Sequence, residues 1–228
     1  MDVDEIITVN EETPRDTNED LLDILTITDI GPVVAEKGMQ YCIDNILPEV
    51  STYLSGFEWR PRAKMIRLFP SLVEHLAEES MFSGDVVAAL FSVWLSDPVQ
   101  AVRAAASETV AVITGKFGQD WGAASLSPQL QGLSKSDVSR FRVAAVDALE
   151  SLISFFDDYH TERYALPVLL SLVADPVPNV RINVAHALNA VAVGHRSLRD
   201  KVRAAIETLY TDPDLDVKEV AEVALKQC

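Results

Sequence analysis

The most informative stretch of this sequence is Asp175-Pro-Val-Pro-Asn-Val-Arg181, because versions of it recur along the chain. An Asp that ends one helix, a Pro that forbids its continuation and an apolar residue before a basic one are typical of a tight turn between helices. The other copies are Asp97-Pro-Val-Gln-Ala-Val-Arg103, Ser136-Asp-Val-Ser-Arg-Phe-Arg142, Asp212-Pro-Asp-Leu-Asp-Val-Lys218 and, more weakly, Gly56-Phe-Glu-Trp-Arg-Pro-Arg62. The chain therefore contains an internal repeat.

The repeat has a period near 40 residues. The basic residues that close the copies fall at positions 62, 103, 142, 181 and 218, which gives steps of 41, 39, 39 and 37 residues. A second marker keeps the same period, since Pro48, Pro128 and Pro167 each follow a short helical start. We place these prolines in the first turn of a helix, where the missing N–H has no intrahelical partner. Between the markers, apolar residues recur at helical spacing.

This period predicts an all-α protein, a HEAT-repeat α-solenoid of about five antiparallel helix pairs that share one continuous core. The expected pairs are approximately Met39–Glu79, Met81–Gly118, Gln119–Asp158, Tyr159–Gly194 and His195–Cys228. Residues 21–38 are expected to form a capping helix or partial repeat, with one helix at about Leu21–Glu36, ahead of the repeat array at 39–228. Residues 1–20 hold eight acidic side chains against Arg15 alone, and we expect an acidic, disordered tail there.

Composition narrows the class of protein. The formal net charge is −16, from 19 basic and 35 acidic residues, so we expect no nucleic acid and no anionic membrane surface as partner. Two widely spaced cysteines, Cys42 and Cys228, fit a reducing compartment. The apolar runs are too short to span a bilayer, and the first residues do not form a signal peptide. We expect a cytoplasmic protein, and the sequence leaves the nucleus open as a second location.

The sequence contains no recognisable catalytic motif and no group of residues with the spacing of a catalytic or metal site. None of the four histidines pairs with another at helical spacing, and no His-Glu dipeptide, GxSxG, P-loop or GxGxxG occurs. Neighbouring carboxylates are expected by chance in a chain this acidic, so they are weak evidence for acid–base chemistry. We therefore expect no enzyme, no metal and no cofactor.

Several longer segments resemble one family. They are WRPRAKMIRLFPSL (59–72), WLSDPVQAVRAAA (94–106), KFGQDW (116–121), LPVLLSLVADPVPNVRINVAHAL (166–188) and DPDLDVKEVAEVAL (212–225). In their order and spacing, from Phe57 to Lys226, they resemble the C-terminal HEAT repeats of the scaffold (A, regulatory) subunit of type 2A serine/threonine protein phosphatases. The resemblance covers about three-quarters of the chain.

The resemblance implies a scaffold that grips a phosphatase catalytic subunit with the turns inside each repeat, and it leaves a further regulatory subunit open as a second partner. Gln100 and Ser139 depart from the family, which tends to carry aromatic residues at these two positions. Carried over position by position, the gripping residues are Trp59, Arg60, Pro98, Val99, Gln100, Ser139, Arg140, Val177, Pro178 and Asn179.

A structural role competes with this functional one at several positions. The periodic Arg62, Arg103, Arg142 and Arg181 are better explained as a ladder that ties repeat to repeat. We also expect Val102, Val180 and Val217 in the core, and Trp94 and Trp121 packed between helices.

Among the turn residues, Trp59 could serve either as a binding hot spot or as a staple of its turn. Val177 is the cleaner functional candidate, because an apolar residue between two prolines has no obvious core to join.

Two alternatives to the phosphatase scaffold remain. The first is a HEAT-repeat adaptor for a different protein partner, such as another phosphatase or a trafficking or cytoskeletal assembly. The second is an enzyme built on HEAT repeats, against which the empty search for catalytic groups speaks.

Overall fold

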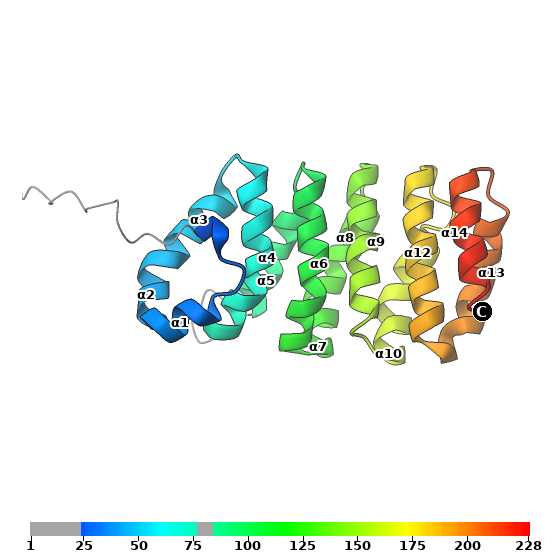
Figure 1. Cartoon of the computed structure of the whole chain (residues 1–228). Helices are drawn as coiled ribbons and strands as arrows, with labels where there is room; N and C mark the ends of the chain where they lie inside the picture. The colour runs from blue at the N-terminus through cyan, green and yellow to red at the C-terminus, as the bar shows by residue number, and fades with distance from the viewer. Residues whose placement is uncertain (1–23, 77–83) are drawn as a thin grey trace, which may run out of the picture.

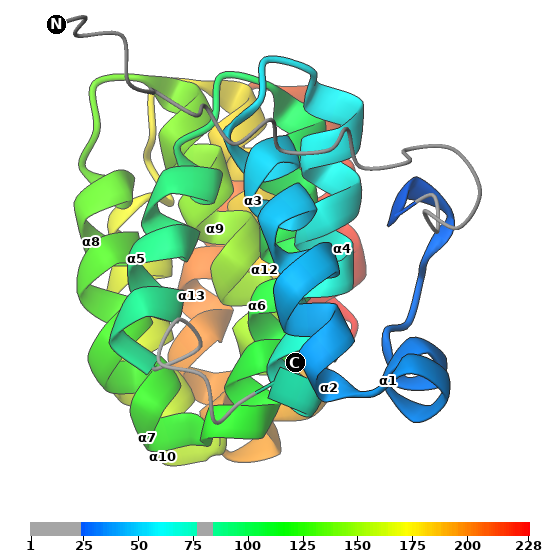
Figure 2. The same cartoon turned by 90° about the vertical axis from the view of Figure 1, so that its left-hand side faces the viewer.

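Helix pairs stack side by side along the chain, as the repeat predicts (Figure 1). The structure is a computed structural model, and it describes residues 24–76 and 84–228. The expected acidic tail, residues 1–20, lies outside these described residues. Seen along the stack, the pairs lie one behind another (Figure 2).

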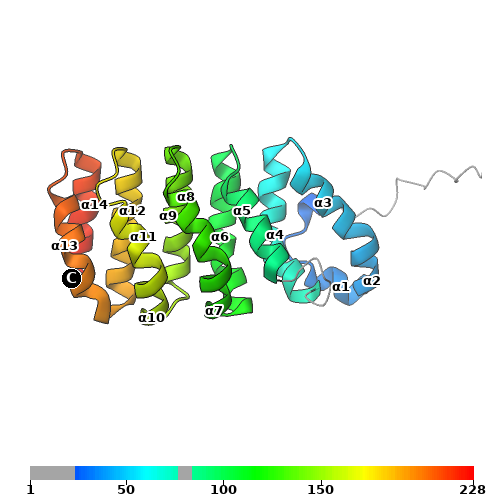
Figure 3. The same ribbon diagram turned by 180° about the vertical axis from the view of Figure 1, so that it is seen from behind.

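Each of the five pairs has a first and a second helix. The second helices are α4 (Trp59–Leu76), α6 (Gln100–Phe117), α9 (Ser139–Ile153), α12 (Pro178–Gly194) and α14 (Leu215–Leu225), and they form the face toward the viewer in Figure 1. The first helices, which face the viewer in Figure 3, are α2–η2–α3 (Met39–Tyr41, Cys42–Ile46, Leu47–Ser55), α5 (Gly84–Leu95), α7–η4–α8 (Gln119–Trp121, Gly122–Leu126, Ser127–Ser134), α10–η5–α11 (Asp158–His160, Thr161–Ala165, Leu166–Ser171) and η6–α13 (Arg196–Leu198, Arg199–Tyr210).

One apolar core runs between the two layers. Val102, Val180 and Val217 are fully buried in it, as expected. Trp94 is buried as well, and its ring meets those of Phe69 and Phe91 edge-on, with centroids 5.0 and 5.3 Å apart. Trp121 is half-buried and packs against the core. None of the described helices is both long enough and apolar enough to cross a membrane.

The three marker prolines each take the second position of an α-helical segment, α3, α8 or α11, as expected, but each of these segments continues from an earlier part of the same helix. Pro48, Pro128 and Pro167 each lie inside a continuous first helix, two residues after a five-residue π-helical turn (η2, η4 and η5). A proline inside an α-helix lacks its N–H and clashes with the carbonyl one turn earlier. The wider π turn takes up this misfit, since it changes the hydrogen-bond register just ahead of the proline.

The expected helix at Leu21–Glu36 is wrong over its described part. The chain forms a 3₁₀ turn, η1 (Ile24–Thr26), and a separate seven-residue helix, α1 (Gly31–Lys37). Asp29 separates them, because its carboxylate accepts hydrogen bonds from the Gly31 amide at 2.9 Å and from the Ser71 hydroxyl of α4 at 2.6 Å.

A pair of glycines relates α1 to the repeats. Gly38 follows α1 with φ 87°, and Gly118 follows α6 with φ 93°, each immediately before a first helix. Glycine suits this left-handed conformation because it has no side chain to clash. Helix α1 therefore stands where the last turns of a second helix would stand.

Each turn inside a repeat is closed by polar contacts with the same spacing. A guanidinium donates to the carbonyl six residues earlier in four turns, at 2.6 to 2.8 Å: Arg62 to Gly56, Arg103 to Asp97, Arg142 to Ser136 and Arg181 to Asp175. In the four turns that begin with Asp97, Ser136, Asp175 and Asp212, this first side chain accepts from the backbone amide two residues on, as Asp175 does from Val177 at 2.9 Å. These contacts fix the turn from both ends.

The expected Arg/Asp ladder is present, but Arg62, Arg142 and Arg181 pair with the carboxylate of the next repeat, not with that of their own. Arg142 donates to both oxygens of Asp175, at 2.6 and 2.8 Å, and Arg181 donates likewise to Asp212, at 2.7 and 2.8 Å. Burial would raise the pKa of Asp175, but hydrogen bonds from Arg142 and from the Val177 amide outweigh it and hold the pKa below its ordinary value. A bidentate, buried pair of this kind is among the stronger polar contacts in a protein.

The ladder is interrupted once. Arg62 donates to Asp97, but the residue of the next repeat that would pair with Arg103 is Ser136, which has no carboxylate. Arg103 is nevertheless buried, and it donates to the carbonyls of Asp97 and Pro98. Desolvation is the main reason that its pKa is lowered. The joint between the second and third pairs therefore lacks its ionic rung.

Replacing Arg142 tests the ladder. We expect Arg142→Ala to lower the free energy of unfolding by about 3–5 kcal/mol, because it leaves the buried Asp175 carboxylate unpaired. The control is Arg67→Ala, which removes an exposed pair with Glu108 and should cost less than about 1 kcal/mol. Urea unfolding followed by circular dichroism measures both. Equal losses would mean that the ladder is no stronger than a surface ion pair.

Supplying the missing rung should stabilise the array. We expect Ser136→Asp to raise the free energy of unfolding by about 1 kcal/mol, since the new carboxylate can accept from Arg103 and from the Val138 amide. A double-mutant cycle with Arg103→Met isolates the pair. If Ser136→Asp stabilises equally with and without the arginine, the gain does not come from a rung.

Candidate functional site

The five turns inside the repeats line up along one edge of the stack, at the top in Figure 1. We call this edge the turn ridge, and it comprises residues 56–60, 96–100, 135–140, 172–179 and 211–215. The ladder holds neighbouring turns at the spacing of one repeat, so the ridge is a regular row. All ten sequence-predicted binding residues belong to it.

Trp59 and Arg60 open α4 at the first turn. The Trp59 side chain is 37% exposed and does not belong to the hydrophobic core, which favours a surface role over a staple. The Arg60 guanidinium lies over the indole ring, 4.6 Å from its centroid. Tryptophan and arginine are the residue types that dominate interface hot spots, and stacking orders both side chains before a partner arrives.

Four other predicted residues come together around one hollow. Gln100, Ser139, Arg140 and Asn179 are from the first residues of three successive second helices, and they line a cavity of about 200 Å³. Arg140 is exposed, and its guanidinium lies 4.8 Å from the centroid of the Phe141 ring. The turn ridge thus has a polar, arginine-bearing hollow at its middle.

Charged side chains meet at the inner side of this hollow. Arg103 and Asp147 line it beside Arg140. Burial, and then the charge of Glu150, raise the pKa of Asp147 to about 6, while Arg103 opposes the shift. Among the described residues that line the hollow, these groups form no catalytic constellation, since no nucleophile there is hydrogen-bonded to a base.

The remaining predicted residues divide by burial. Pro98 and Pro178 are exposed on the turn ridge. Val99 and Val177 are half-buried and pack against the core, so the expectation that Val177 has no core to join is wrong. The reason is the turn itself: the Asp175 carboxylate binds the Val177 amide and draws the turn back over the helix ends.

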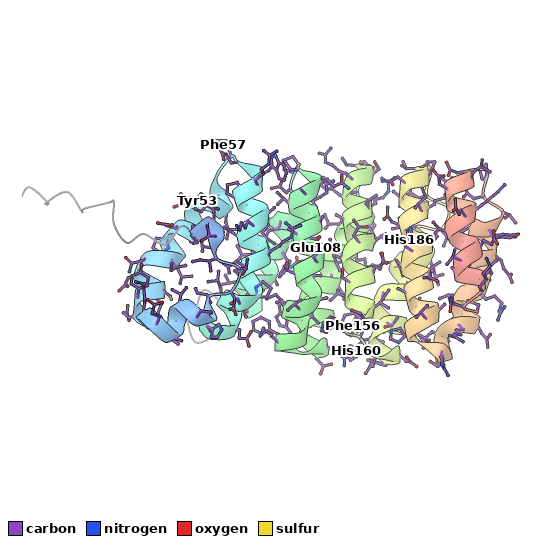
Figure 4. The ribbon with its side chains drawn as sticks, in the orientation of Figure 1. Tyr53, Phe57, Glu108, Phe156, His160 and His186 are labelled. Carbon is purple, nitrogen blue, oxygen red and sulfur yellow. The ribbon has the colours of Figure 1, made fainter. Side chains whose placement is uncertain are left out.

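Sequence reasoning missed three exposed apolar residues of the turn ridge. Phe57 is fully exposed at the tip of the first turn (Figure 4), Leu215 is 76% exposed at the last, and Val138 is exposed at the third. The signal that could have found them was position, because each lies inside a repeat-aligned turn and outside the helical apolar stripe. Together with Trp59 they make the turn ridge partly apolar, as the centre of a protein interface is.

His160 and His195 lie away from the turn ridge and join neighbouring helix pairs. His160 lies on the opposite edge, with its ring nitrogens 2.7 Å from Asp157 and 3.1 Å from Asp120 of the preceding pair (Figure 4). His195 is placed similarly, 2.7 Å from Asp158. Within residues 24–76 and 84–228, no group of three or more His, Cys, Asp or Glu side chains is placed to hold a metal ion.

Comparisons with known proteins agree with this architecture. The family described as HEAT repeats matches residues 126–226. The A-type regulatory subunit of protein phosphatase PP2A from Saccharomyces cerevisiae is 30% identical over 129 residues, which is 51% of this chain and 20% of that protein. The chain therefore spans about a fifth of the length of this curated relative.

Solved structures show the same fold. The designed armadillo repeat protein YIII(Dq)4CqI is 18% identical with a TM-score of 0.51, and the match covers 90% of both chains. A second designed armadillo repeat protein, solved in complex with the peptide (KR)4, is 18% identical with a TM-score of 0.53 over 84% of this chain and 85% of that one. The chain has the all-helical solenoid fold of HEAT and armadillo repeat proteins.

The His160 contacts predict a pH dependence of stability. Burial lowers the pKa of His160, but its hydrogen bonds to Asp157 and Asp120 outweigh this effect and raise the pKa above its ordinary 6.5. The native state therefore holds this proton more tightly than the unfolded chain does. The resulting stability is fully present below pH 6.5 and is lost as the pH rises through the native pKa.

We expect the melting temperature to fall by about 2 °C more between pH 6 and pH 8.5 in the natural chain than in His160→Gln. Differential scanning calorimetry in matched buffers measures both profiles, and groups other than His160 cancel in the comparison. Parallel profiles would show that the proton on His160 does not stabilise the fold.

Proposed function

We propose that the chain is a non-catalytic scaffold that holds the catalytic subunit of a serine/threonine phosphatase of type 2A along its turn ridge. The observation that carries the proposal is the stacked Trp59–Arg60 pair, which is exposed and ordered at one end of a regular row of turns. The similarity to a PP2A regulatory subunit over half of the chain supports the class of partner.

The shape of the turn ridge suits a protein partner. A long, shallow edge with exposed Trp59, Phe57 and Leu215 offers apolar anchors, and Arg60 and Arg140 offer directed donors between them. The ladder keeps the anchors in register, so little ordering entropy remains to be lost on binding. In this proposal the chain performs no chemical step of its own, and any chemistry belongs to the partner.

The hollow at the middle of the turn ridge gives this scaffold its own specificity. Gln100 and Ser139 line it in place of the aromatic residues that the phosphatase scaffolds tend to carry. We infer that polar contacts at the hollow replace part of the apolar grip, and that a further regulatory subunit can join the assembly. We place the protein in the cytoplasm, with the nucleus as a second compartment.

A direct binding assay tests the proposal. We expect the immobilised chain to bind a purified type 2A catalytic subunit, and Trp59→Ala/Arg60→Ala to weaken binding by about 30-fold, the equivalent of a hot spot of about 2 kcal/mol. The matched control is Tyr159→Ala/Arg163→Ala, which removes an exposed aromatic residue and an exposed arginine at the opposite edge. The control should bind within twofold of the natural chain.

Two outcomes would contradict the proposal in different ways. No binding by the natural chain would exclude this phosphatase class and favour an adaptor for another protein. Binding that the Trp59/Arg60 variant retains in full would mean that the partner docks elsewhere than on the turn ridge.

A further inference from the structure

An apolar groove lies between the first helices of the first two pairs, on the face toward the viewer in Figure 3. Its volume is about 370 Å³. Helix α3 forms one wall with Val50 and Leu54, and α5 forms the other with Leu90 and Val93. The buried side chains of Phe69 and Leu72, from α4 behind them, form the floor.

The groove follows the axes of its two walls. Its lining residues on α3 recur at positions 47, 50, 51, 54 and 55, and those on α5 at positions 86, 90, 93 and 94. This is the spacing of one face of a helix, so each wall presents a continuous apolar stripe about two turns long. Val93 is 67% exposed at the rim, which leaves the stripe open to solvent.

The other joints of the same layer are closed differently. Between α5 and α8, the Ser92 hydroxyl donates to the Gln129 side chain. Between α8 and α11 the corresponding space is about 200 Å³, and Gln131, Arg163 and Tyr164 line it with polar groups. The groove between α3 and α5 is larger and lined almost wholly by apolar side chains, so it differs in kind from these joints.

The charges beside the groove have one sign. Helices α3 and α5 contain Glu49 and Asp85 and no lysine, arginine or histidine. Asp44 adds a third carboxylate on η2, at the N-terminal side of α3. None of these carboxylates lines the groove, but they lie on the helices that form it, in a chain of net charge −16. An apolar groove in such a negative field is complementary to an apolar stripe that is flanked by basic residues.

We propose that this groove docks an amphipathic helix of a partner protein, with an apolar stripe against Leu54, Leu90 and Val93 and with lysines or arginines on its other faces, which the net negative charge of the chain attracts. An inserted helix would lie along the two walls and complete the outer layer where α3 and α5 leave it open. Helix-in-groove docking uses this combination of an apolar seam and charged flanks. The surface is separate from the turn ridge, so the proposal stands independently of the phosphatase.

Charge argues against the two occupants that the chain itself could supply. Residues 1–20 carry eight acidic side chains and one basic residue, so the net negative charge of the chain disfavours them as the occupant. A second copy of the chain would bring another net charge of −16 to the same surface. A basic helix from a different protein would not be repelled in this way, because its charge is opposite to that of the chain.

The probe is a fluorescein-labelled 18-residue peptide, acetylated and amidated, with leucines at positions i, i+3, i+4, i+7 and i+8 of a helix and lysines elsewhere. Fluorescence anisotropy measures its dissociation constant for the full chain. We expect Val93→Asp to raise that constant at least tenfold, although it adds a charge that attracts lysine. The matched control is Val193→Asp on α12, 55% exposed in the natural chain, which should stay within twofold.

Two control peptides separate apolar docking from plain charge attraction. A scrambled sequence of the same composition and a Leu/Glu peptide with the same apolar stripe should each bind at least tenfold more weakly. Equal binding by the two valine variants, or equal binding of the scrambled peptide, would overturn the proposal. Far-UV circular dichroism and melting temperatures confirm that both variants fold.

Two further measurements address the other occupants. We expect a chain that begins at Ile24 to bind the peptide no more than twofold differently, and sedimentation velocity to show the same species for the natural chain and Val93→Asp. A tenfold gain on truncation would assign the groove to the chain's own N-terminal residues. A dimer that Val93→Asp dissociates would assign it to a second copy, and either result would overturn the proposal.

Discussion

A single carboxylate serves two neighbouring repeats at most joints of this array. Asp175 closes its own turn through the Val177 amide and also holds Arg142 of the preceding repeat, and Asp212 holds Arg181 in the same way. Arg142, Asp175 and Asp212 are buried and Arg181 is half-buried, so loss of either partner leaves a poorly solvated charge without its counterion. The same contact therefore sets stability and the spacing of the turn ridge. A partner that binds along the row of turns would depend on this shared carboxylate for the spacing of the turns, without contacting it.

The sequence predicts the architecture well because a repeat multiplies a weak local signal. A turn motif that returns every 39 residues or so implies a stack of helix pairs, and the apolar stripes then place Val102 and Val180 in the core. The ladder was also predictable as a periodic Asp/Arg pattern. Its true pairing was not, because the arginine and the aspartate of one motif contact different repeats. Whether an arginine pairs with the aspartate of its own motif or with that of the next repeat depends on the distance between stacked repeats, which the sequence does not give.

The position of each candidate residue on a turn was predictable, but the grouping of these residues around one hollow was not. Gln100, Ser139 and Asn179 share a hollow because three successive helices begin at the same height, which no single motif encodes. Val177 was misjudged for the same reason, since its burial depends on how the turn folds over the core. The π turns were not predicted either: their own sequences (CIDNI, GAASL and TERYA) share no pattern, and the proline that follows each of them by two residues does not by itself specify a π turn.

The absence of a carboxylate at Ser136 has a mechanical consequence. An array whose repeats touch only their neighbours behaves like springs in series, and its deformation concentrates in the softest joint. The joint between the second and third pairs lacks the ionic rung that braces the others, and the hollow lined by Gln100 and Arg140 spans it. Bending of the solenoid should thus open or close that hollow before it disturbs the remaining turns. A force or a bound partner at either end of the array should therefore change the geometry of this joint more than that of the other joints.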